Sequence, residues 1–514
     1  MNQLFNSREP FSCKQFWFAF CFVTILALLL RLPTLASRSL WLDETYSAWF
    51  AALPLRELWT SVPLYETHPP VYYTLLKGWS VVTGTSEAAL RSLSVAASVV
   101  SVMLLAASTR LLGLGGLAQR VSLLGGLFLA CNAGSILFAQ QARPYAIQTV
   151  VASVAVLCSL VILRGFGQNA SDTGMKRTAK PWLWGVGLGL SAGCTLWMHN
   201  TGFFIALGIW AGLITATLLF ARWKWRQSVL VCGAAGIAAL LVWLPFLPTF
   251  LGQTAAMASM RYWLSFHLID LAGAWALPLG SVYVAVPGGL LAAAGIARLW
   301  RTHRALACHI LVVLLLAPLL MGAYSYFIKP IFIARLFAWL GPMLMGVVAL
   351  GVFSLPVNWR APVVGLMLAL SAYSTYNFYQ KPTENWRDMV AWIEERIQPG
   401  DLVVAVPNEI QLPVAYYGHD SKLGSHVVYL PAAFPARGLD REYVTNLGAP
   451  AVGRPDIQRL EALLTPGRRV WLMERRPDIF DRKRIVTATL NGRLTPIETL
   501  VGSAMTITLY SSRR

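Results

Sequence analysis

The sequence predicts a mostly helical membrane protein, a polytopic bundle of about eleven spans with a small α/β domain at its C-terminus. The first observation is composition: 56% of the 514 residues are hydrophobic and only 13% are charged, which soluble domains rarely combine. The second is the distribution of charge. Residues 1–380 contain 24 Lys/Arg and 8 Asp/Glu, whereas residues 381–514 contain 18 and 15. We therefore expect a transmembrane domain over 1–380 and a water-exposed domain over 381–514.

Eleven apolar segments are long enough to cross a bilayer, which takes about 20 residues per helix. They lie near residues 14–34, 87–110, 120–139, 143–164, 182–199, 201–221, 228–250, 280–299, 305–326, 332–353 and 361–379. The first of them follows Arg8 and Lys14 and resembles the apolar part of a signal peptide. We interpret it as a retained first span because the topology requires it.

The loops between these segments differ in charge. Alternate loops contain thirteen basic residues and one acid, Asp172. The basic residues are Arg110, Arg120, Arg164, Lys176, Arg177, Lys180, Arg222, Lys224, Arg226, Arg298, Arg301, Arg304 and Arg360. Basic loops stay in the cytoplasm. We therefore expect a multi-pass protein of the bacterial inner membrane with a cytoplasmic N-terminus and a periplasmic C-terminal domain. Its basic excess favours anionic lipid or phosphate over nucleic acid.

The C-terminal region has the pattern of an α/β unit. Apolar residues recur at helical spacing from Trp386 to Ile397, and Pro399-Gly400 ends that helix. Further strands are expected at 402–406, 426–430, 469–473, 484–490 and 504–510, with a helix near 456–464. All seven cysteines lie outside this region, without a CxxC motif, so they indicate neither a disulfide framework nor a zinc site.

The long first outer loop, residues 35–86, contains adjacent carboxylates at Asp43 and Glu44. Neighbours on a helix point about 100° apart, so one is expected to face a reaction centre while the other orients it or pairs with a cation. The alternative is that Asp43 only caps the helix. Because ionised groups near hydrocarbon are unfavourable and residues 1–380 contain only 8 acids, we favour Asp43 as a general base.

Two further patterns occur in this loop. Tyr46, Trp49, Phe50 and Leu53 follow at helical spacing, which predicts a helix lying flat on the bilayer surface. His68 precedes Pro69-Pro70, and proline suits a first helical turn, so His68 is expected beside the exposed N–H groups of a helix start. It then either binds phosphate or only caps the helix.

Three basic residues lie at outer span ends: Arg143, Lys329 and Arg335. A guanidinium at this depth needs an anion, and its planar fork suits phosphate oxygens. The alternative is that these side chains extend to lipid headgroups, which we favour for Lys329 only. His199, beside Asn200, either lines the cavity or forms a satisfied structural pair.

With these motifs in order, the sequence resembles the GT-C superfamily of membrane glycosyltransferases. The resemblance is to family 39-like members, related to protein O-mannosyltransferases and lipid A aminoarabinose transferases. It is carried by Asp43-Glu44, the stretch His68-Pro69-Pro70-Val71-Tyr72-Tyr73, the segment 87–94, the turn Ala142-Arg143-Pro144-Tyr145, and Arg335. It extends over most of the chain, including the tail from Asn385 onward.

The resemblance implies a polyprenyl-phosphate-linked sugar as donor and transfer on the periplasmic face. The catalytic acid of the family maps onto Asp43 and its phosphate-contacting arginine onto Arg143. Aminoarabinose transferases have a lysine near the place of His68, which argues against the same donor. We expect donor phosphate binding by Arg143, Arg335 and His68, and Lys329 is the fourth candidate beside the headgroup contact favoured for it. A substrate cavity is expected to be lined by Tyr72, Tyr73, Tyr145 and His199.

The expected reaction is a single displacement that inverts the anomeric configuration. Asp43 takes the proton of an acceptor hydroxyl, and cations receive the leaving phosphate. A retaining pair needs carboxyl groups about 5 Å apart, and Glu44 is too close in sequence to supply the second one easily. No ligand spacing demands a metal, and a divalent cation (Mg²⁺ or Mn²⁺) assisting Asp43 or Glu44 stays open. The acceptor is a lipid, a glycan or a protein.

Three alternatives remain. The first is a ligase or polymerase that transfers polysaccharide blocks. The second is a transporter of lipid-linked glycans, which predicts inverted repeats and helices broken near mid-membrane, and the sequence has neither. The third is an inactive scaffold that uses the tail for docking.

Overall fold

The computed structural model describes residues 12–111, 116–167, 181–220, 225–258, 260, 264–418, 423–424 and 426–512. Six charged residues of the expected cytoplasmic loops lie outside these ranges: Asp172, Lys176, Arg177, Lys180, Arg222 and Lys224. The chain forms two compact units. Unit 1 comprises Met1–Leu35, Arg91–Leu247 and Leu264–Gln380, and unit 2 comprises Ala36–Leu90, Pro248–Trp263 and Lys381–Arg514. The expected boundary after residue 380 is also the last junction between the units, but the first outer loop groups with the tail.

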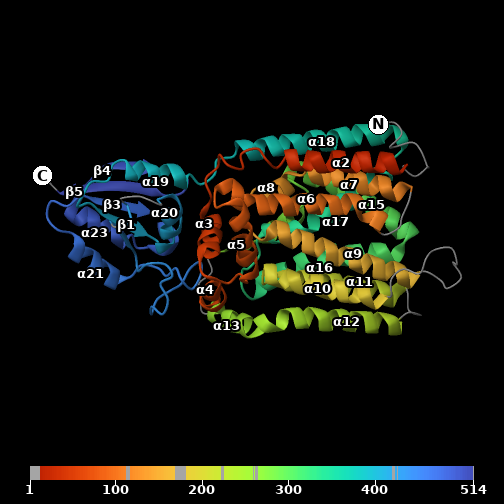
Figure 1. Ribbon diagram of the computed structural model, residues 1–514, viewed down its shortest axis with the longest axis horizontal. Coiled ribbons are helices and arrows are strands. Elements are labelled where there is room, and N and C mark those ends of the chain that lie inside the picture. The colour runs from red at the N-terminus through yellow and green to blue at the C-terminus, as the bar shows by residue number, and fades with distance from the viewer. Residues whose placement is uncertain are drawn as a thin grey trace. The chain divides into compact units, whose positions relative to one another are not determined.

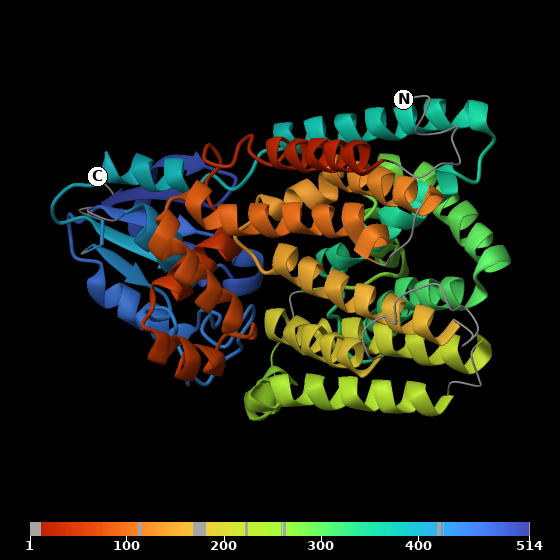
Figure 2. The ribbon, with the colours of Figure 1, turned by 45° about the vertical axis from the view of Figure 1, so that its right-hand side comes forward.

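Unit 1 is a bundle of long helices whose axes run nearly parallel (Figure 1). They are α2 (Cys13–Leu29), α6 (Glu87–Leu111), α7 (Leu117–Ala130), α8 (Ala133–Ala139), α9 (Tyr145–Gly167), α10 (Pro181–Met198), α11 (Gly202–Phe220), α12 (Trp225–Trp243), α15 (Val282–Thr302), α16 (Arg304–Phe327), α17 (Gly341–Val352) and α18 (Val357–Gln380). Short turns η3 (Leu244–Phe246), η4 (Leu268–Ala272), α14 (Gly273–Ala276) and η5 (Ala334–Leu340) connect them. Figure 2 shows α12 alongside α10 and α11, which it contacts.

Each of the eleven expected spans coincides with a helix or a helix pair. Within the described residues, 7 helices are long and apolar enough to cross a membrane, or up to 8 if one bent pair counts as a span. The helices α2, α10 and α18 are outside that set, so the number of eleven crossings stays a prediction. The polytopic helical architecture is confirmed.

The expected span 120–139 is broken into α7 and α8, which meet at an angle of 61°. The break has a local cause at Asn132. Its side-chain oxygen accepts a hydrogen bond from the Ser135 N–H (2.8 Å) and so caps α8, while its amide nitrogen donates to the Pro278 carbonyl (3.0 Å). A capping side chain starts a new helix in the middle of an apolar run.

Helices α15 and α17 pack closely because glycines lie between them. A Cβ added at Gly351 would lie 1.9 Å from the Leu291 carbonyl oxygen, and one added at Gly295 would lie 2.3 Å from the Val347 carbonyl oxygen. Small residues allow helix backbones to approach in this way inside membranes. The backbones of α15 and α17 are therefore in close contact at two positions along the helices.

The tail part of unit 2 is a five-stranded sheet in the order β2-β1-β3-β5-β4. The strands are β1 (Leu402–Val406), β2 (Val427–Tyr429), β3 (Val470–Glu474), β4 (Leu494–Val501) and β5 (Thr506–Ser512). β1 is parallel to β2 and β3, while β5 is antiparallel to β3 and β4. The carboxyl ends of the three parallel strands therefore share one edge of the sheet.

Helices cover both faces of this sheet. They are α19 (Trp386–Glu394), η6 (Asn408–Ile410), α20 (Gln411–Tyr417), α21 (Arg454–Leu463), α22 (Pro477–Phe480) and α23 (Ile485–Arg493). On one face Trp471 of β3 packs against Trp392 of α19, with ring centroids 5.7 Å apart. On the other face Leu472 belongs to a cluster with Leu460 of α21 and Leu490 of α23. The predicted α/β character of the tail is confirmed.

The predicted strand at 484–490 is wrong, because these residues form α23. The Asp481 carboxylate accepts hydrogen bonds from the N–H groups of Ile485 (2.9 Å) and Val486 (3.0 Å), which starts a helix. Val486 and Leu490, four residues apart, are then both buried on its inner face. The strand in this region is β4, which begins nine residues after the first residue of α23.

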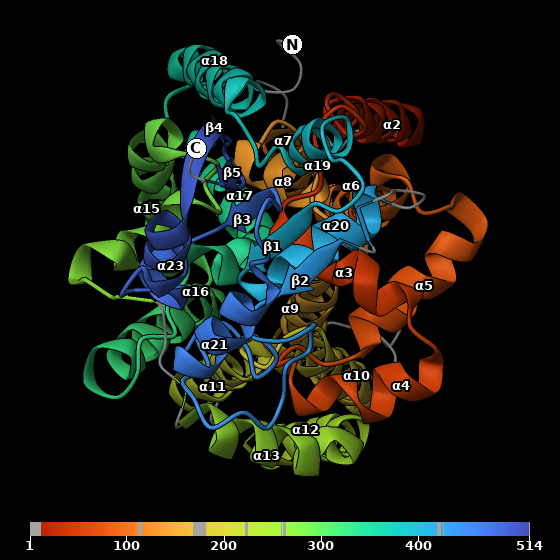
Figure 3. The same cartoon turned by 90° about the vertical axis from the view of Figure 1, so that its left-hand side faces the viewer.

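The remaining elements of unit 2 come from the first outer loop and from one further segment. They are α3 (Leu42–Ala52), α4 (Leu55–Thr60), η1 (Val62–Leu64), α5 (Val71–Thr83) and α13 (Leu247–Ala258). Figure 3 shows α3 next to α20, and the two are in contact. The helix that carries the two adjacent carboxylates is thus packed on the α/β tail.

Candidate functional site

The two adjacent carboxylates have different surroundings in the first turn of α3. Glu44 is fully buried, and its Oε2 accepts a hydrogen bond from the Trp41 N–H (3.1 Å), which caps the helix. Asp43 is partly exposed. The capping role that the sequence left open for Asp43 is thus performed by Glu44, and Asp43 is the member of the pair that keeps contact with solvent.

The aromatic face of α3 is turned into unit 2. Phe50 is fully buried and packs on Tyr73 of α5 (centroids 4.9 Å apart) and on Tyr65 (6.1 Å). The ring of Tyr46 lies edge-on to Phe434 of the tail (5.4 Å). Tyr46 and Phe50 are therefore covered by protein, and the position of this helix flat on the bilayer surface stays a prediction. Aromatic residues of the tail and of α5 cover these two rings, and periodicity alone does not reveal what covers an apolar face.

The hydroxyl of Tyr46 is tied to a buried acid of the tail. It donates a 2.5 Å hydrogen bond to Glu409 Oε1, which also accepts one from the Thr445 hydroxyl (2.7 Å). The Asn446 side chain donates to the Tyr46 hydroxyl oxygen (2.7 Å). Glu409 is 1% exposed and lies in η6, directly after strand β1. It is the most deeply buried carboxyl group near Asp43 that the sequence reading did not select.

Burial raises the pKa of the Glu409 carboxyl group, and the negative charge of Asp43 raises it further. The charge of Arg475 and the hydrogen bonds from Tyr46 and Thr445 oppose this shift. Burial and the charge of Glu409 also raise the pKa of Tyr46. Because the charge of Asp43 acts on Glu409, the two carboxyl groups lie in one neighbourhood of unit 2.

His68 lies where the sequence placed it, just before α5. Its backbone N–H donates to Glu66 Oε1 (3.0 Å), and its ring Nδ1 contacts the same oxygen. Gln253 of α13 donates to the Glu66 carbonyl (2.8 Å) and so holds this turn in place. A histidine already paired with a carboxylate is a weaker phosphate ligand, and a phosphate role for His68 stays a prediction. Tyr72 and Tyr73 follow and are both 1% exposed.

In unit 1 the two predicted arginines lie around Tyr145. The Arg335 guanidinium is 5.9 Å from the centre of the Tyr145 ring, within cation–π range. Arg143, two residues before Tyr145, is 3% exposed, and the Ser94 hydroxyl donates to its carbonyl (3.4 Å). Tyr145 is itself buried and packs on Phe138 (5.3 Å). Two cationic residues thus flank the start of α9.

Lys329 and His199 are in loops of unit 1. The Lys329 N–H donates to the Tyr324 carbonyl (3.1 Å), and burial lowers the pKa of its amine. His199 Nδ1 accepts from the Thr201 N–H (3.1 Å) and contacts its hydroxyl (2.8 Å). That arrangement fits the structural pairing considered for His199. The phosphate and cavity roles of the two residues stay predictions.

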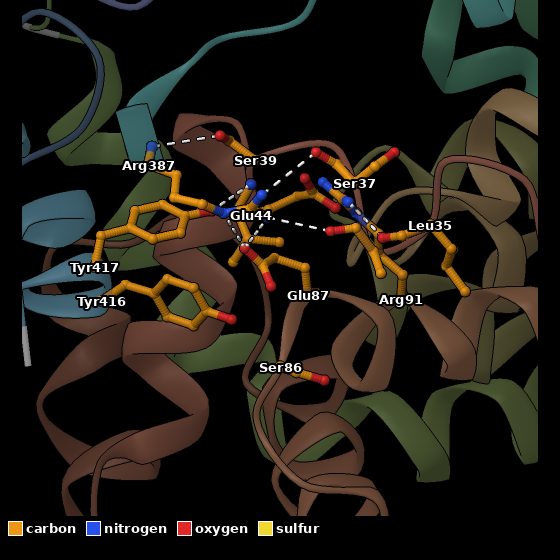
Figure 4. A network of polar contacts seen from close by, with 12 residues as sticks. Leu35, Ser37, Ser39, Glu44, Ser86, Glu87, Arg91, Arg387, Tyr416 and Tyr417 are labelled. Carbon is orange, nitrogen blue, oxygen red and sulfur yellow. Dashed lines mark hydrogen bonds and ion pairs between the residues drawn. The ribbon is translucent and has the colours of Figure 1, made fainter. Parts of the chain in front are cut away.

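The structure adds tail residues that bind the chain just before α3. Arg387 contacts Glu87 and the hydroxyl of Ser39, as Figure 4 shows, and Tyr417 and Glu384 accept hydrogen bonds from the N–H groups of Leu40 and Leu42. The sequence reading missed them because each acts across more than 300 positions of the chain. The residues next to Arg387, Tyr417 and Glu384 in the sequence form no pattern that indicates these distant partners.

In the described part of the chain, no three His, Cys, Asp or Glu side chains come together as a metal site. Asp43 belongs to unit 2, whereas Arg143 and Arg335 belong to unit 1.

The fold is similar to those of two known membrane proteins. AglB, an archaeal oligosaccharyltransferase from Archaeoglobus fulgidus in complex with an inhibitory peptide and a dolichol-phosphate, matches with a TM-score of 0.54 and 13% identity over 89% of this chain and 69% of its own. A structure of the A. fulgidus oligosaccharyltransferase with Zn and sulfate matches with a TM-score of 0.53 and 14% identity over 88% of this chain and 68% of its own. ArnT from Cupriavidus metallidurans bound to undecaprenyl phosphate matches with a TM-score of 0.53 and 12% identity over 95% of this chain and 97% of its own.

No family model and no curated protein matches the sequence. At these identities the likeness to solved structures shows the fold alone. The chain has the same fold as these proteins, a polytopic helical bundle with a C-terminal domain, and it matches ArnT over nearly the whole length of both chains. The resemblance expected from the sequence motifs is confirmed at the level of fold.

Proposed function

We propose that the protein is an inverting glycosyltransferase that moves a sugar from a polyprenyl-phosphate donor to an acceptor hydroxyl on the periplasmic face of the inner membrane. The fold supports this proposal because both similar proteins were determined with a polyprenyl phosphate bound, dolichol-phosphate in AglB and undecaprenyl phosphate in ArnT. The acceptor is a lipid, a glycan or a protein, and the peptide complex of AglB concerns that protein only.

The observation that carries the proposal is the pair of arginines around Tyr145. Arg143 is 3% exposed and Arg335 lies 5.9 Å above the Tyr145 ring, so both guanidinium groups are held at the start of a membrane helix. Two arginines at the end of a membrane helix create a positive region that suits an anionic headgroup. A lipid phosphate at the headgroup level is an anion of the right charge, and its oxygens match the planar fork of arginine.

In the proposed reaction, Asp43 accepts the proton of the acceptor hydroxyl. The hydroxyl oxygen forms a bond to the anomeric carbon while the bond from that carbon to the phosphate oxygen breaks. The electron pair of that bond stays on the phosphate, whose charge Arg143 and Arg335 stabilise. One displacement inverts the anomeric centre. Glu44 takes no part as a nucleophile, because its carboxylate caps α3 at the Trp41 N–H.

The proposed orientation follows from the charges of the loops. Thirteen basic residues in alternate loops favour a cytoplasmic N-terminus. With an odd number of crossings the tail is periplasmic, and the arginines at the start of α9 are then at the periplasmic leaflet. Cysteine labelling from outside the cell tests this, since single cysteines introduced in the tail of a cysteine-free variant are expected to react with an impermeant reagent.

The test of the reaction uses the full-length protein in lipid vesicles with undecaprenyl-phosphate-linked pentoses and hexoses. The measured product is free undecaprenyl phosphate, which every sugar releases. Asp43→Asn is expected to lower turnover by about 10²- to 10⁴-fold, the usual contribution of a general base. Asp478→Asn is the matched control, because Asp478 is an exposed tail carboxylate paired with Arg476. Full turnover of Asp43→Asn would remove Asp43 from the mechanism.

A further inference from the structure

Four residues of the tail hydrogen-bond to the segment that leads into α3 and to the first two turns of that helix. They are Arg387, Tyr417, Glu384 and Glu409, and they bind residues at positions 36–39, 40, 42 and 46 respectively. We call this set of four the α3 clasp. All its members and all its targets belong to unit 2.

The clasp begins with Arg387 of α19. Its backbone N–H donates to the Ser39 hydroxyl (3.3 Å), and its guanidinium donates to the Ala36 carbonyl (3.1 Å) and to Glu87 Oε1 (3.1 Å from Nε). Figure 4 shows Arg387 between Ser39 and Glu87. Because Glu87 starts α6, this arginine joins the chain before α3 to the chain after α5.

The next two contacts bind backbone amides just before α3 and at its first residue, and the second of them satisfies an N–H group that a helix start leaves without a partner. The Leu40 N–H donates to the Tyr417 hydroxyl (2.6 Å), and the Leu42 N–H donates to Glu384 Oε2 (2.7 Å). The first N–H groups of a helix have no partner inside the helix, and a carboxylate there also interacts favourably with the helix dipole. Asp43 is the residue directly after Leu42. The amide that precedes it is thus capped by a carboxylate 342 positions away.

Glu384 is itself fixed in place. Its Oε2 also accepts a hydrogen bond from the Trp386 indole N–H (2.7 Å), and its Oε1 accepts one from the Arg475 guanidinium (3.1 Å). Trp386 is fully buried. Both oxygens of the Glu384 carboxylate therefore accept hydrogen bonds, which fixes the orientation of the side chain. A carboxylate with a fixed orientation can in turn fix the position of the Leu42 N–H that it binds.

The last contact holds the second turn of α3. Glu409 Oε1 accepts a hydrogen bond from the Tyr46 hydroxyl (2.5 Å), and Tyr46 follows Asp43 by three residues, on a neighbouring position of the helix. Glu409 follows β1 and Arg475 follows β3, and the Arg475 N–H donates to the Val406 carbonyl (2.8 Å). The clasp is therefore built on the carboxyl edge of the parallel strands, where α/β domains place functional side chains.

We propose that the tail is the positioning device for Asp43, with Glu384 and Glu409 as positioning residues that set the height and rotation of α3. This rests on the proposed function, in which Asp43 is the general base. The capping contact at Leu42 fixes where the helix begins, and the contact at Tyr46 fixes how it is turned about its axis. Together they determine the direction in which the Asp43 side chain projects.

The experiment compares Glu384→Ala, Glu384→Gln and Tyr46→Phe in the full-length protein in vesicles. Displacing a catalytic group by about 1 Å lowers turnover on the order of 10²-fold. We expect Glu384→Ala and Tyr46→Phe to lower kcat by that order without changing the KM for undecaprenyl-phosphate-linked sugar. Glu384→Gln keeps an oxygen for the Leu42 N–H and is expected to recover most of the loss. Glu461→Gln, which removes an exposed tail carboxylate paired with Arg493, is the control.

A second measurement does not depend on activity. Hydrogen–deuterium exchange of the backbone amides of Leu42–Ala52 is expected to accelerate in Glu384→Ala and Tyr46→Phe and to stay unchanged in Glu461→Gln. Unchanged kcat in both clasp variants overturns the proposal, as does an equal rise in the donor KM. If Asp43→Asn is fully active while the clasp variants accelerate exchange, the proposed base fails and the clasp remains as a structural contact only. Tyr46→Phe keeps the ring, so it serves if Glu384→Ala does not fold.

Discussion

The hydroxyl of Tyr46 and the carboxylate of Glu409 are joined by a 2.5 Å hydrogen bond across 363 positions of the chain. Tyr46 lies on the helix that carries Asp43, and Glu409 follows a buried parallel strand of the tail. The contact therefore links the candidate acid to the rigid part of unit 2. Because Glu409 is buried, its ionisation is expected to change the stability of the folded protein.

The stability of the protein is expected to depend on pH through Glu409. Burial raises the pKa of this carboxyl group above its ordinary value of 4.5. Between that value and the raised one, the folded protein keeps a proton that the unfolded chain has released, so stability falls as the pH rises through this window. We expect the melting temperature of the detergent-solubilised protein to fall with rising pH in this range.

Glu409→Gln identifies the group responsible. The amide cannot ionise, and its oxygen still accepts the hydrogen bond from Tyr46, so this variant is expected to lose the part of the slope that Glu409 contributes. The other charges that act on Glu409 are those of Arg475 and Asp43, and both are retained. An identical slope in wild type and Glu409→Gln would show that this carboxyl group titrates normally.

The two adjacent carboxylates are expected to respond differently to loss of charge. Glu44→Gln keeps an oxygen for the Trp41 N–H, so the cap survives and turnover is expected to change by less than about 1 kcal/mol in activation free energy. Asp43→Asn is expected to lose the reaction. Steady-state kinetics of both variants in the same vesicles make the comparison. Equal losses would assign a chemical role to Glu44 as well.

Arg143→Lys is expected to weaken donor binding while keeping the positive charge. An ammonium group cannot contact two phosphate oxygens in the fixed geometry of a guanidinium, so the Kd for undecaprenyl phosphate is expected to rise about tenfold. Arg301→Lys is the control, since Arg301 is an exposed residue in the last turn of α15. An unchanged Kd for Arg143→Lys would support headgroup contact by that side chain instead of donor binding.

Gly351→Ala is expected to destabilise unit 1 by about 1–3 kcal/mol, because the added methyl group would overlap the Leu291 carbonyl of the neighbouring helix. Gly289→Ala is the matched control on α15, where an added Cβ meets nothing within 4 Å. Thermal unfolding of the two variants in detergent measures the difference. Equal melting temperatures would mean that α15 and α17 can move apart to admit the added methyl group without a loss of stability.

The membrane part of the fold was predictable because long apolar segments have few alternatives. Every expected span coincides with a helix, and the boundaries differ by several residues. What the hydropathy pattern does not contain is the break at Asn132, where one side chain caps a new helix inside an apolar run. The same limit applies to residues 484–490, where the Asp481 cap overrides an alternating pattern.

The candidate site was predictable to the extent that local patterns indicate it. Asp43, Arg143 and Arg335 stand out as rare charges at span ends. Glu384 and Glu409 do not, because acidic residues are common in the tail, where 15 of the 23 occur. Their importance comes from contacts with α3 that only the folded chain creates. Hydrogen bonds between residues so far apart in the chain produce no regular spacing of residues in the sequence.

The glycine contacts between α15 and α17 have a mechanical consequence. Two helices whose backbones touch at Gly295 and Gly351 lose those contacts if they slide or tilt apart, so we expect them to move together. Under the proposed function, the lateral gate for a polyprenyl chain is then expected along the other helices of unit 1. Crosslinking α15 to α17 is expected to leave lipid entry intact, whereas a crosslink across the gate blocks it.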